Sequence, residues 1–332
     1  MTQPRKIRWL IAHQPEELFV RTATAFASEL AKHCGDQFEV EILTYPKYVS
    51  KYGEITGLDK LSKYDQVNAI TPGQKSDIEQ GIEAFWSSLE DGVIEMSQTQ
   101  VSLIAQWHYD FAAIDMPYMF DSHDHVSRVV DGEIGQELCQ KLGEKSPVTG
   151  LAFTYSGGYR VIGSDEPIYD LDDLQGLRVI VENDLSLGNT AERLGAKAIQ
   201  VKPQFWKKLD LIGQGEADAV ETTYLRFNGK HILKTNHSMF MTTILIGNRF
   251  WSTLTEEQQH AFTMAARGAS IIERQWALED SQRFEDEAVA KGISIKDISD
   301  QDQARLKHAS QLNYVKAAPR FSKGLLAKIR RT

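Results

Sequence analysis

The sequence lacks most features of a membrane-spanning, zinc-binding or nucleic-acid-binding protein. Only two cysteines occur in 332 residues, Cys34 and Cys139, and they match neither a CxxC pair nor a zinc spacing. The longest apolar runs fall well short of 18 residues, so no spanning helix is expected. The formal net charge is −9 and Lys and Arg gather nowhere, which argues against a nucleic-acid surface.

The cysteines and the N-terminus leave the cellular compartment open. Cys34 and Cys139 either form a disulfide or remain two buried thiols, and their spacing does not decide between these alternatives. The opening MTQPRKIRWLIAHQ is basic, but its apolar run is too short for a secretory signal. The chain is therefore either cytoplasmic or a form from which a signal has been removed.

Signatures of catalysis are also absent from the sequence. It contains no P-loop, GxGxxG, GxSxG or HExxH motif. His123 and His125 lie two apart beside Asp121 and Asp124, a grouping compatible with a metal. A polar helix start capped by Asp or Ser explains the same residues more simply. We expect no metal, no cofactor and no enzymatic activity.

Short strand patterns alternate with helical patterns, which predicts an α/β fold. Residues 44–73 between them are rich in Tyr, Lys, Gly and Pro and are expected to be irregular. Strands are expected at Ile7–Ala12, Phe38–Leu43, Val93–Gln98, Gly150–Ile162, Leu177–Val181, Ala217–Glu221 and Ser238–Gly247. Helices are expected at Pro15–Lys32, Gln74–Glu90, His125–Leu142 and Thr255–Lys291.

The helix predicted over Thr255–Lys291 is unusually long. Thr255 and Gln258 fit a capping box at its start, and Gly292 ends it. At about 1.5 Å per residue it would extend roughly 55 Å, which exceeds one small domain. A chain of 332 residues also favours two lobes of about 150 residues each. We interpret this helix as a spine shared by two lobes.

Six sequence blocks, taken in order, resemble a known family. They are AFASEL, LEDGVIEMSQTQ, IDMPYMFDSHDHVSRVVDGEIGQEL, SGGYRVIGSDEPIYDLDDLQGLRV, LGAKAIQVKPQFWKKLDLIGQGEADAVE and GNRFWSTLTEEQQHAF. Each block is weak alone, but together they cover nearly the whole chain. The sequence resembles the DctP-type substrate-binding proteins of tripartite ATP-independent periplasmic (TRAP) transporters.

The resemblance implies a two-lobed periplasmic-binding-protein architecture with mixed sheets, crossing hinge strands and one long helix spanning both lobes. The expected lobes are residues 1–153 plus 240–275 and residues 154–239 plus 276–332, with the ligand cleft between them. The implied function is a periplasmic, monomeric receptor that closes on a small polar, carboxylate-bearing solute. It delivers the solute to the membrane subunits of an ion-driven transporter. Two alternatives stay open, a ligand-sensing receptor of the same architecture and an enzyme with an active site between the lobes.

The resemblance also implies which residues bind the solute. Family members use two arginines for the ligand carboxylate, and Arg160 matches the first. The second position is Ile180, while Arg178 lies two residues earlier on the same face of the strand and is either a substitute or a surface cation. Glu182 adds an acid where members often have Pro. One lost cation and one added acid favour a zwitterionic or amine-bearing solute, or a neutral polar one with a single acid, over a simple dicarboxylate.

Further ligand contacts are expected at positions that match the family blocks or end strands near the cleft. Glu221 has a simpler alternative as a polar contact between lobes, and the amides of Gln100 and Asn248 are compatible with bonds to backbone. Of the two aromatic side chains at 205 and 206, one is expected to form a wall of the pocket and the other to pack in the core. The residues are Gln100, Asn183, Phe205, Trp206, Glu221, Thr222, Asn248, His13 and Tyr155.

Overall fold

The chain divides into two structural units, each with its own sheet and core. The computed structural model describes residues 3–13, 15–59, 72–181, 187–200, 212–224, 227 and 229–332. Unit 1 comprises Met1–His108, Val126–Ser156 and Met241–Ala277. Unit 2 comprises Tyr109–His125, Gly157–Phe240 and Leu278–Thr332.

Unit 1 is built on a five-stranded sheet of order β2-β1-β3-β10-β4. Strand β1 pairs parallel with both β2 and β3, whereas β10 runs antiparallel to β3. The strands are β1 (Arg5–Ile11), β2 (Phe38–Thr44), β3 (Met96–Gln100), β4 (Val148–Tyr159) and β10 (Met239–Gly247). The helices are α1 (Glu16–Cys34), α2 (Tyr45–Tyr52), α4 (Pro72–Glu90), α5 (Val101–Ile104), α6 (His123–Val130), α7 (Glu133–Lys145), α10 (Asn248–Trp251) and α11 (Glu256–Ala290).

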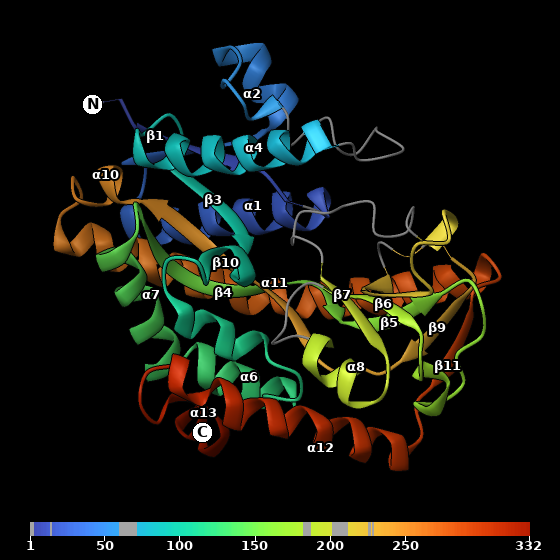
Figure 1. Ribbon diagram of the computed structural model, residues 1–332. Helices are drawn as coiled ribbons and strands as arrows, with labels where there is room; N and C mark the ends of the chain where they lie inside the picture. The colour runs from blue at the N-terminus through green and yellow to red at the C-terminus, as the bar shows by residue number, and fades with distance from the viewer. Residues whose placement is uncertain are drawn as a thin grey trace. The chain divides into compact units, whose positions relative to one another are not determined.

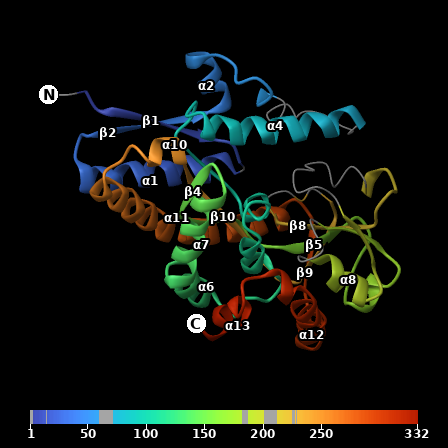
Figure 2. The same ribbon diagram turned by 60° about the vertical axis from the view of Figure 1, so that its left-hand side comes forward.

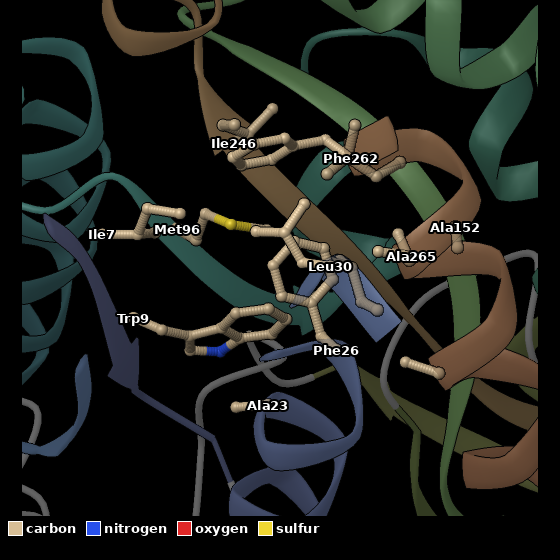
Figure 3. Packing of buried hydrophobic residues seen from close by; sticks show 14 of the residues in the cluster. Ile7, Trp9, Ala23, Phe26, Leu30, Met96, Ala152, Ile246, Phe262 and Ala265 are labelled. Carbon is tan, nitrogen blue, oxygen red and sulfur yellow. The ribbon is translucent and has the colours of Figure 1, made fainter. Parts of the chain in front are cut away.

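The core of unit 1 lies between the sheet and the apolar stripes of α1 and α11. Phe262 of α11 contacts Phe26 edge-on at 5.8 Å between ring centroids and Phe38 at 5.0 Å. Trp9 packs on Phe26 at 5.1 Å. Figure 3 shows these helix side chains over the strand residues Ile7, Trp9, Met96 and Ile246. The helical periodicity read in the sequence therefore marks the faces that meet here.

Unit 2 is built on a six-stranded mixed sheet of order β11-β9-β5-β8-β6-β7. Strand β5 is antiparallel to β8 and β9, and β6 is parallel to β7 and β8. The strands are β5 (Val161–Ser164), β6 (Arg178–Val181), β7 (Lys197–Gln200), β8 (Ala219–Thr222), β9 (His231–Lys234) and β11 (Ser294–Asp297). Helical segments are η2 (Tyr109–Asp115), η3 (Asp172–Leu174), α8 (Asn189–Arg193), α12 (Asp300–Ala317), η6 (Ala318–Arg320) and α13 (Leu325–Arg331).

Alternate residues of β6 enter two separate apolar clusters of unit 2. Val179 and Val181 pack with Leu306 of α12. Ile180 packs with Ala288 of α11 and Val220 of β8. Since successive strand residues point to opposite faces, the two clusters lie on opposite sides of the sheet. Figure 1 shows α12, drawn in red, passing along unit 2 as a separate helix from α11.

The structure confirms the predicted fold class, two mixed sheets covered by helices. It confirms six of the seven predicted strands and the long helix, which runs from Glu256 to Ala290. The strand expected over Gly150–Ile162 is instead two strands, β4 and β5, which belong to different sheets. The capping box is formed, because Thr255 Oγ1 accepts from the Gln258 N–H while Gln258 Oε1 accepts from the Thr255 N–H. The unit boundary falls within α11, and also within β4 and β10.

Three further expectations about secondary structure and lobe membership differ from the structure. Residues 45–52 form helix α2 rather than irregular chain, with Pro46 placed where a first turn tolerates it. The single helix expected over 125–142 is two helices, since Gly132 separates α6 from α7. The segment 109–125 belongs to unit 2, although the first lobe was expected to contain it. Its Tyr118 hydroxyl donates to the carbonyl of Thr235, the residue after β9, at 2.9 Å, which joins the segment to unit 2.

Both cysteines are free and buried, so of the two alternatives the structure shows two thiols. Burial raises the pKa of Cys139 to about 12 and also raises that of Cys34. No helix among the described residues has the length and apolar character needed to cross a membrane.

Candidate functional site

Arg160 is a buried cation at the start of the unit 2 sheet. It follows the crossing strand β4 and immediately precedes β5. Only 2% of its surface is exposed. Its guanidinium carbon lies 4.4 Å from the centroid of Phe240, and Nη2 lies 3.7 Å from Oδ1 of Asp115. Its backbone N–H donates to the Ser238 carbonyl. Burying an arginine is costly unless an anion accompanies it, and Asp115 supplies one such charge.

Two glycines shape the approach to Arg160. Gly157 and Gly158 have φ of +77° and +78°, a conformation that side-chain-bearing residues rarely adopt. A Cβ on Gly158 would also lie 2.7 Å from the Cβ of Ser281. The glycine pair therefore gives the backbone a conformation that few other residues could adopt, immediately before Arg160.

Glu221 and His237 form a buried pair in unit 2. Neither has appreciable exposure, and His237 Nε2 lies 3.1 Å from Glu221 Oε1. The other ring nitrogen, Nδ1, lies 2.8 Å from Thr235 Oγ1. A proton on Nε2 would be donated to the carboxylate, with Nδ1 accepting from the threonine hydroxyl. His237 was not predicted, because a lone histidine before a strand carries no local motif.

Neither Arg178 nor Ile180 supplies a second cation next to Arg160. The neighbours of Arg160 described above are Asp115 and Phe240. The side chain of Ile180 is fully buried among apolar neighbours. Arg178 holds Asp218 through two bonds, Nε to Oδ2 at 3.0 Å and Nη2 to Oδ1 at 2.8 Å. This bidentate contact lowers the pKa of Asp218. Arg178 therefore fits the surface-cation alternative that the sequence left open.

Three residues of unit 1 that are expected near the solute are buried at separate places in that unit. Gln100 is buried at the C-terminal end of β3. His13 is buried just after β1, with its ring 5.3 Å from that of Phe19. Tyr155 is buried in β4, and its backbone N–H donates to Glu273 Oε2. Thr222, in unit 2, is half-buried at the end of β8.

A buried polar network in unit 1 was missed from the sequence. Gln98 Nε2 donates to Thr154 Oγ1 at 2.6 Å and to Thr242 Oγ1 at 3.1 Å. The two threonine hydroxyls are themselves 2.6 Å apart. These residues come from β3, β4 and β10, so the network exists only once three strands far apart in sequence are assembled. Its small polar side chains gave no spacing signal.

The side chain of Asn248 forms three hydrogen bonds with other groups of unit 1. Its Nδ2 donates to the carbonyls of Gly143 at 3.0 Å and Ser146 at 2.8 Å. Its Oδ1 accepts from the Thr149 hydroxyl at 2.7 Å. Gly143 and Ser146 lie at the end of α7, where helix carbonyls lack intrahelical donors. The backbone-satisfied alternative for Asn248 therefore describes its contacts, and a solute contact there stays a prediction.

Four predicted site residues, Glu182, Asn183, Phe205 and Trp206, lie outside the described residues. The described part of the chain brings no three His, Cys, Asp or Glu side chains together as a metal site. In the same part, Ser122 Oγ accepts from the His125 N–H at 3.1 Å, as the helix-cap interpretation predicts.

The family of the chain is established by its match to a family model. Residues 79–319 match the bacterial extracellular solute-binding protein family 7, DctP. The chain belongs to this family.

Curated relatives match over shorter stretches. A solute-binding protein of Chromohalobacter salexigens is 23% identical over 201 residues, covering 58% of this chain and 59% of the relative. The C4-dicarboxylate-binding periplasmic protein DctP of Rhodobacter capsulatus is 24% identical over 181 residues, covering 52% and 53%. The matched stretch spans less than two thirds of either relative.

Solved structures share the fold over almost the whole chain. A TRAP periplasmic solute-binding protein from Desulfovibrio desulfuricans, with bound sn-glycerol-3-phosphate, has a TM-score of 0.75 at 19% identity. The similarity covers 98% of this chain and 95% of that one. One from Pseudomonas putida F1, with bound D-glucuronate, has a TM-score of 0.73 at 18% identity and covers 98% and 97%.

Proposed function

We propose that this protein is an extracytoplasmic receptor that closes on a small polar, carboxylate-bearing solute and delivers it to an ion-driven membrane transporter. The observation that carries the proposal is Arg160, a buried guanidinium beside Phe240. A planar guanidinium with several donors suits a carboxylate, and little else in a transport receptor needs a cation at such a depth. Membership of the solute-binding family supports transport, and two proteins of similar structure hold sn-glycerol-3-phosphate and D-glucuronate.

The proposed solute carries a single carboxylate. Ile180 offers no cation and Arg178 is engaged with Asp218, so we assign the carboxylate to Arg160. Asp115 already offsets part of that charge, which disfavours a second carboxylate. A sugar acid, a zwitterion or an amine-bearing acid satisfies these conditions better than a dicarboxylate.

The remaining predicted contacts belong to the same proposal. We assign them to hydrogen bonds with hydroxyl or amine groups of the solute and to an aromatic wall. Closure then follows because contacts made only in the closed state shift the population towards it. The residues so assigned are Gln100, Glu182, Asn183, Phe205, Trp206, Glu221, Thr222, His13 and Tyr155.

The proposed receptor is a periplasmic monomer without enzymatic activity. Membership of the family supports a receptor that binds its solute outside the cytoplasm and passes that solute to membrane subunits. The described residues hold no metal-type grouping, and the proposed role requires none.

A thermal-shift screen tests this function. The panel contains sugar acids, amino acids, betaine-like zwitterions, amines and dicarboxylates. A solute that binds the native state raises the melting temperature by mass action. We expect a shift with a monocarboxylate or zwitterion and little with dicarboxylates. A shift confined to dicarboxylates contradicts the assigned solute class, and no shift with any acid contradicts the carboxylate role of Arg160.

Calorimetric titration of two variants then tests the residue assignment. Arg160→Gln is expected to lose roughly 2–5 kcal/mol of binding free energy, because it removes one partner of a desolvated charge pair. Arg178→Gln serves as the matched control and should bind as the parent does, since that side chain is turned to Asp218. The Arg160→Lys variant keeps the charge and separates lost recognition from misfolding. Equal losses in the Arg160 and Arg178 variants would refute the assignment.

A further inference from the structure

The last 30 residues of the chain are positively charged, unlike the rest of it. Residues 303–332 contain eight of the 37 Lys and Arg residues and no Asp or Glu. The preceding 302 residues hold the other 29 Lys and Arg together with all 46 Asp and Glu. The expectation that Lys and Arg gather nowhere in the sequence is therefore wrong for this segment. A positive segment in an acidic protein indicates an anionic partner.

The first two cations of this segment are paired with acids of unit 2. The guanidinium of Arg305 lies 2.6 Å from the carboxylate of Asp172 and 2.7 Å from that of Asp302. Lys307 Nζ lies 3.2 Å from Asp121 Oδ1. Because these charges are matched within the protein, they contribute little attraction for an outside partner.

The five cations considered next are exposed and are not paired in this way. In the part of the chain that the structure describes, none of them forms an ion pair with a carboxylate. Their charge is therefore directed to the solvent or to a partner. These residues, called the basic end below, are Lys316, Arg320, Lys323, Arg330 and Arg331.

Ring contacts hold the backbone of the basic end in place. The guanidinium carbon of Arg330, in α13, lies 4.1 Å from the ring centroid of Tyr314, in α12. That of Arg320 lies 3.9 Å from the ring centroid of Tyr109. Figures 1 and 2 both show α13 beside the C-terminal end of α12. The five cations are therefore gathered at one end of unit 2.

Two aliphatic side chains are exposed beside the basic end. Val315 is 76% exposed and Leu312 is 44% exposed, and they lie three residues apart on α12, which places them on one face. Val315 directly precedes Lys316 of the basic end. The core-facing side of the helix carries Leu306 and Asn313, both buried. Exposed aliphatic residues next to cations are typical of helices that bind a membrane surface.

A bilayer with anionic headgroups supplies partners for both kinds of side chain. Lys and Arg are attracted to the lipid phosphates and can keep their charged groups in the headgroup layer. The acyl boundary beneath that layer accepts short aliphatic side chains such as those of Leu312 and Val315. An acidic protein surface would neutralise the cations, but it would also need an apolar recess shaped for these two residues. A bilayer requires no such fit, so the combination favours lipid.

We propose that the basic end, together with Leu312 and Val315, binds reversibly to the surface of a bilayer that contains anionic lipid. The attraction is mainly electrostatic, so salt weakens it. The surface includes none of the residues assigned to the solute. It therefore adds a membrane-surface interaction to the proposed solute receptor.

Vesicle flotation of the whole chain tests the proposal. The probes are vesicles of phosphatidylcholine alone and vesicles in which about one third of the lipid is phosphatidylglycerol. At about 0.1 M NaCl we expect binding to be about tenfold stronger, or more, for the vesicles with phosphatidylglycerol. Most of that difference should disappear at about 0.5 M NaCl, because the Debye length shortens.

Matched variants locate the binding surface. Lys316→Gln combined with Lys323→Gln removes two cations of the basic end and should weaken binding to phosphatidylglycerol vesicles by about tenfold or more. Lys291→Gln combined with Lys296→Gln removes the same charge from exposed positions elsewhere in unit 2 and should bind nearly as the parent does. Val315→Ser should weaken binding severalfold without changing its salt dependence, since its contribution is apolar.

Three results would overturn the proposal. Equal binding to both kinds of vesicle would show that the cations are not used. Equal losses in the two double variants would make the net charge of the protein, rather than the basic end, the cause. No binding to either vesicle would exclude a bilayer, and binding of a soluble polyglutamate peptide in that case would make an acidic protein segment the occupant.

The receptor function is measured separately on the same proteins. All variants should keep the solute-induced thermal shift of the parent, because none of the changed residues is assigned to the solute. A normal thermal shift without vesicle binding would therefore overturn the membrane-surface proposal and leave the receptor function standing.

Discussion

Replacing Asn248 by alanine should destabilise unit 1 without weakening solute binding. The side chain makes three hydrogen bonds, two of them to carbonyls at the end of α7. A typical intramolecular hydrogen bond contributes about 1 kcal/mol net. Asn248 is half-buried, and water can reach part of the vacated site, so we expect a loss of roughly 2 kcal/mol rather than the full sum. For a unit of this size that corresponds to roughly 4–8 °C in melting temperature.

The assay is urea and thermal unfolding followed by tryptophan fluorescence, together with calorimetric titration of the solute found in the screen. The surface variant Gln140→Ala is the control and should change stability by less than about 0.5 kcal/mol. An Asn248→Ala protein as stable as the parent would refute the capping account. A normal stability with a tenfold or larger loss of affinity would instead make Asn248 a solute contact.

Three other predictions concern pH, thiol reactivity and packing. Burial lowers the pKa of His123, so the unfolded chain takes up its proton first as pH falls. Stability should therefore decline from pH 7 towards pH 5, and His123→Phe should flatten that decline in urea unfolding; an unchanged slope contradicts this. Cys34 and Cys139 should resist a thiol reagent at pH 8 and react only in denaturant, because burial raises both pKa values; rapid labelling of the native protein refutes this. Phe262→Ala should cost about 3–5 kcal/mol in chemical unfolding, and Phe262→Leu clearly less; equal losses would exclude a packing cause.

Much of the fold was predictable because it depends on local patterns. The helix expected over Pro15–Lys32 and the capping box at Thr255 each depend on residues only a few positions apart in the sequence. The break between α6 and α7 was missed because Gly132 alone resembles a tolerated helix glycine. The segment at 109–125 was misplaced because its attachment to Thr235 joins residues more than a hundred apart.

The site was less predictable than the fold. Arg160 was expected near the solute from its match to a family position, and the structure shows that its side chain is buried. The partners Asp115, Phe240 and His237 could not be assigned, because no spacing in the chain relates them to Arg160 or Glu221. Asn248 illustrates a different limit of sequence reasoning. A family position suggested a ligand contact, while its amide is bonded to nearby backbone.

The burial of Arg160 affects how solute binding should depend on the salt concentration of the medium. Dissolved ions screen exposed charges over a Debye length of about 8–10 Å at 0.1–0.15 M salt, but they reach buried charges poorly. A surface that carries −9 overall repels anions weakly at low salt and hardly at all in brine. In the proposed receptor, a guanidinium sheltered from that medium would keep nearly the same attraction for its solute in both. Under the proposed function, capture rates should then vary with salinity more than affinity does.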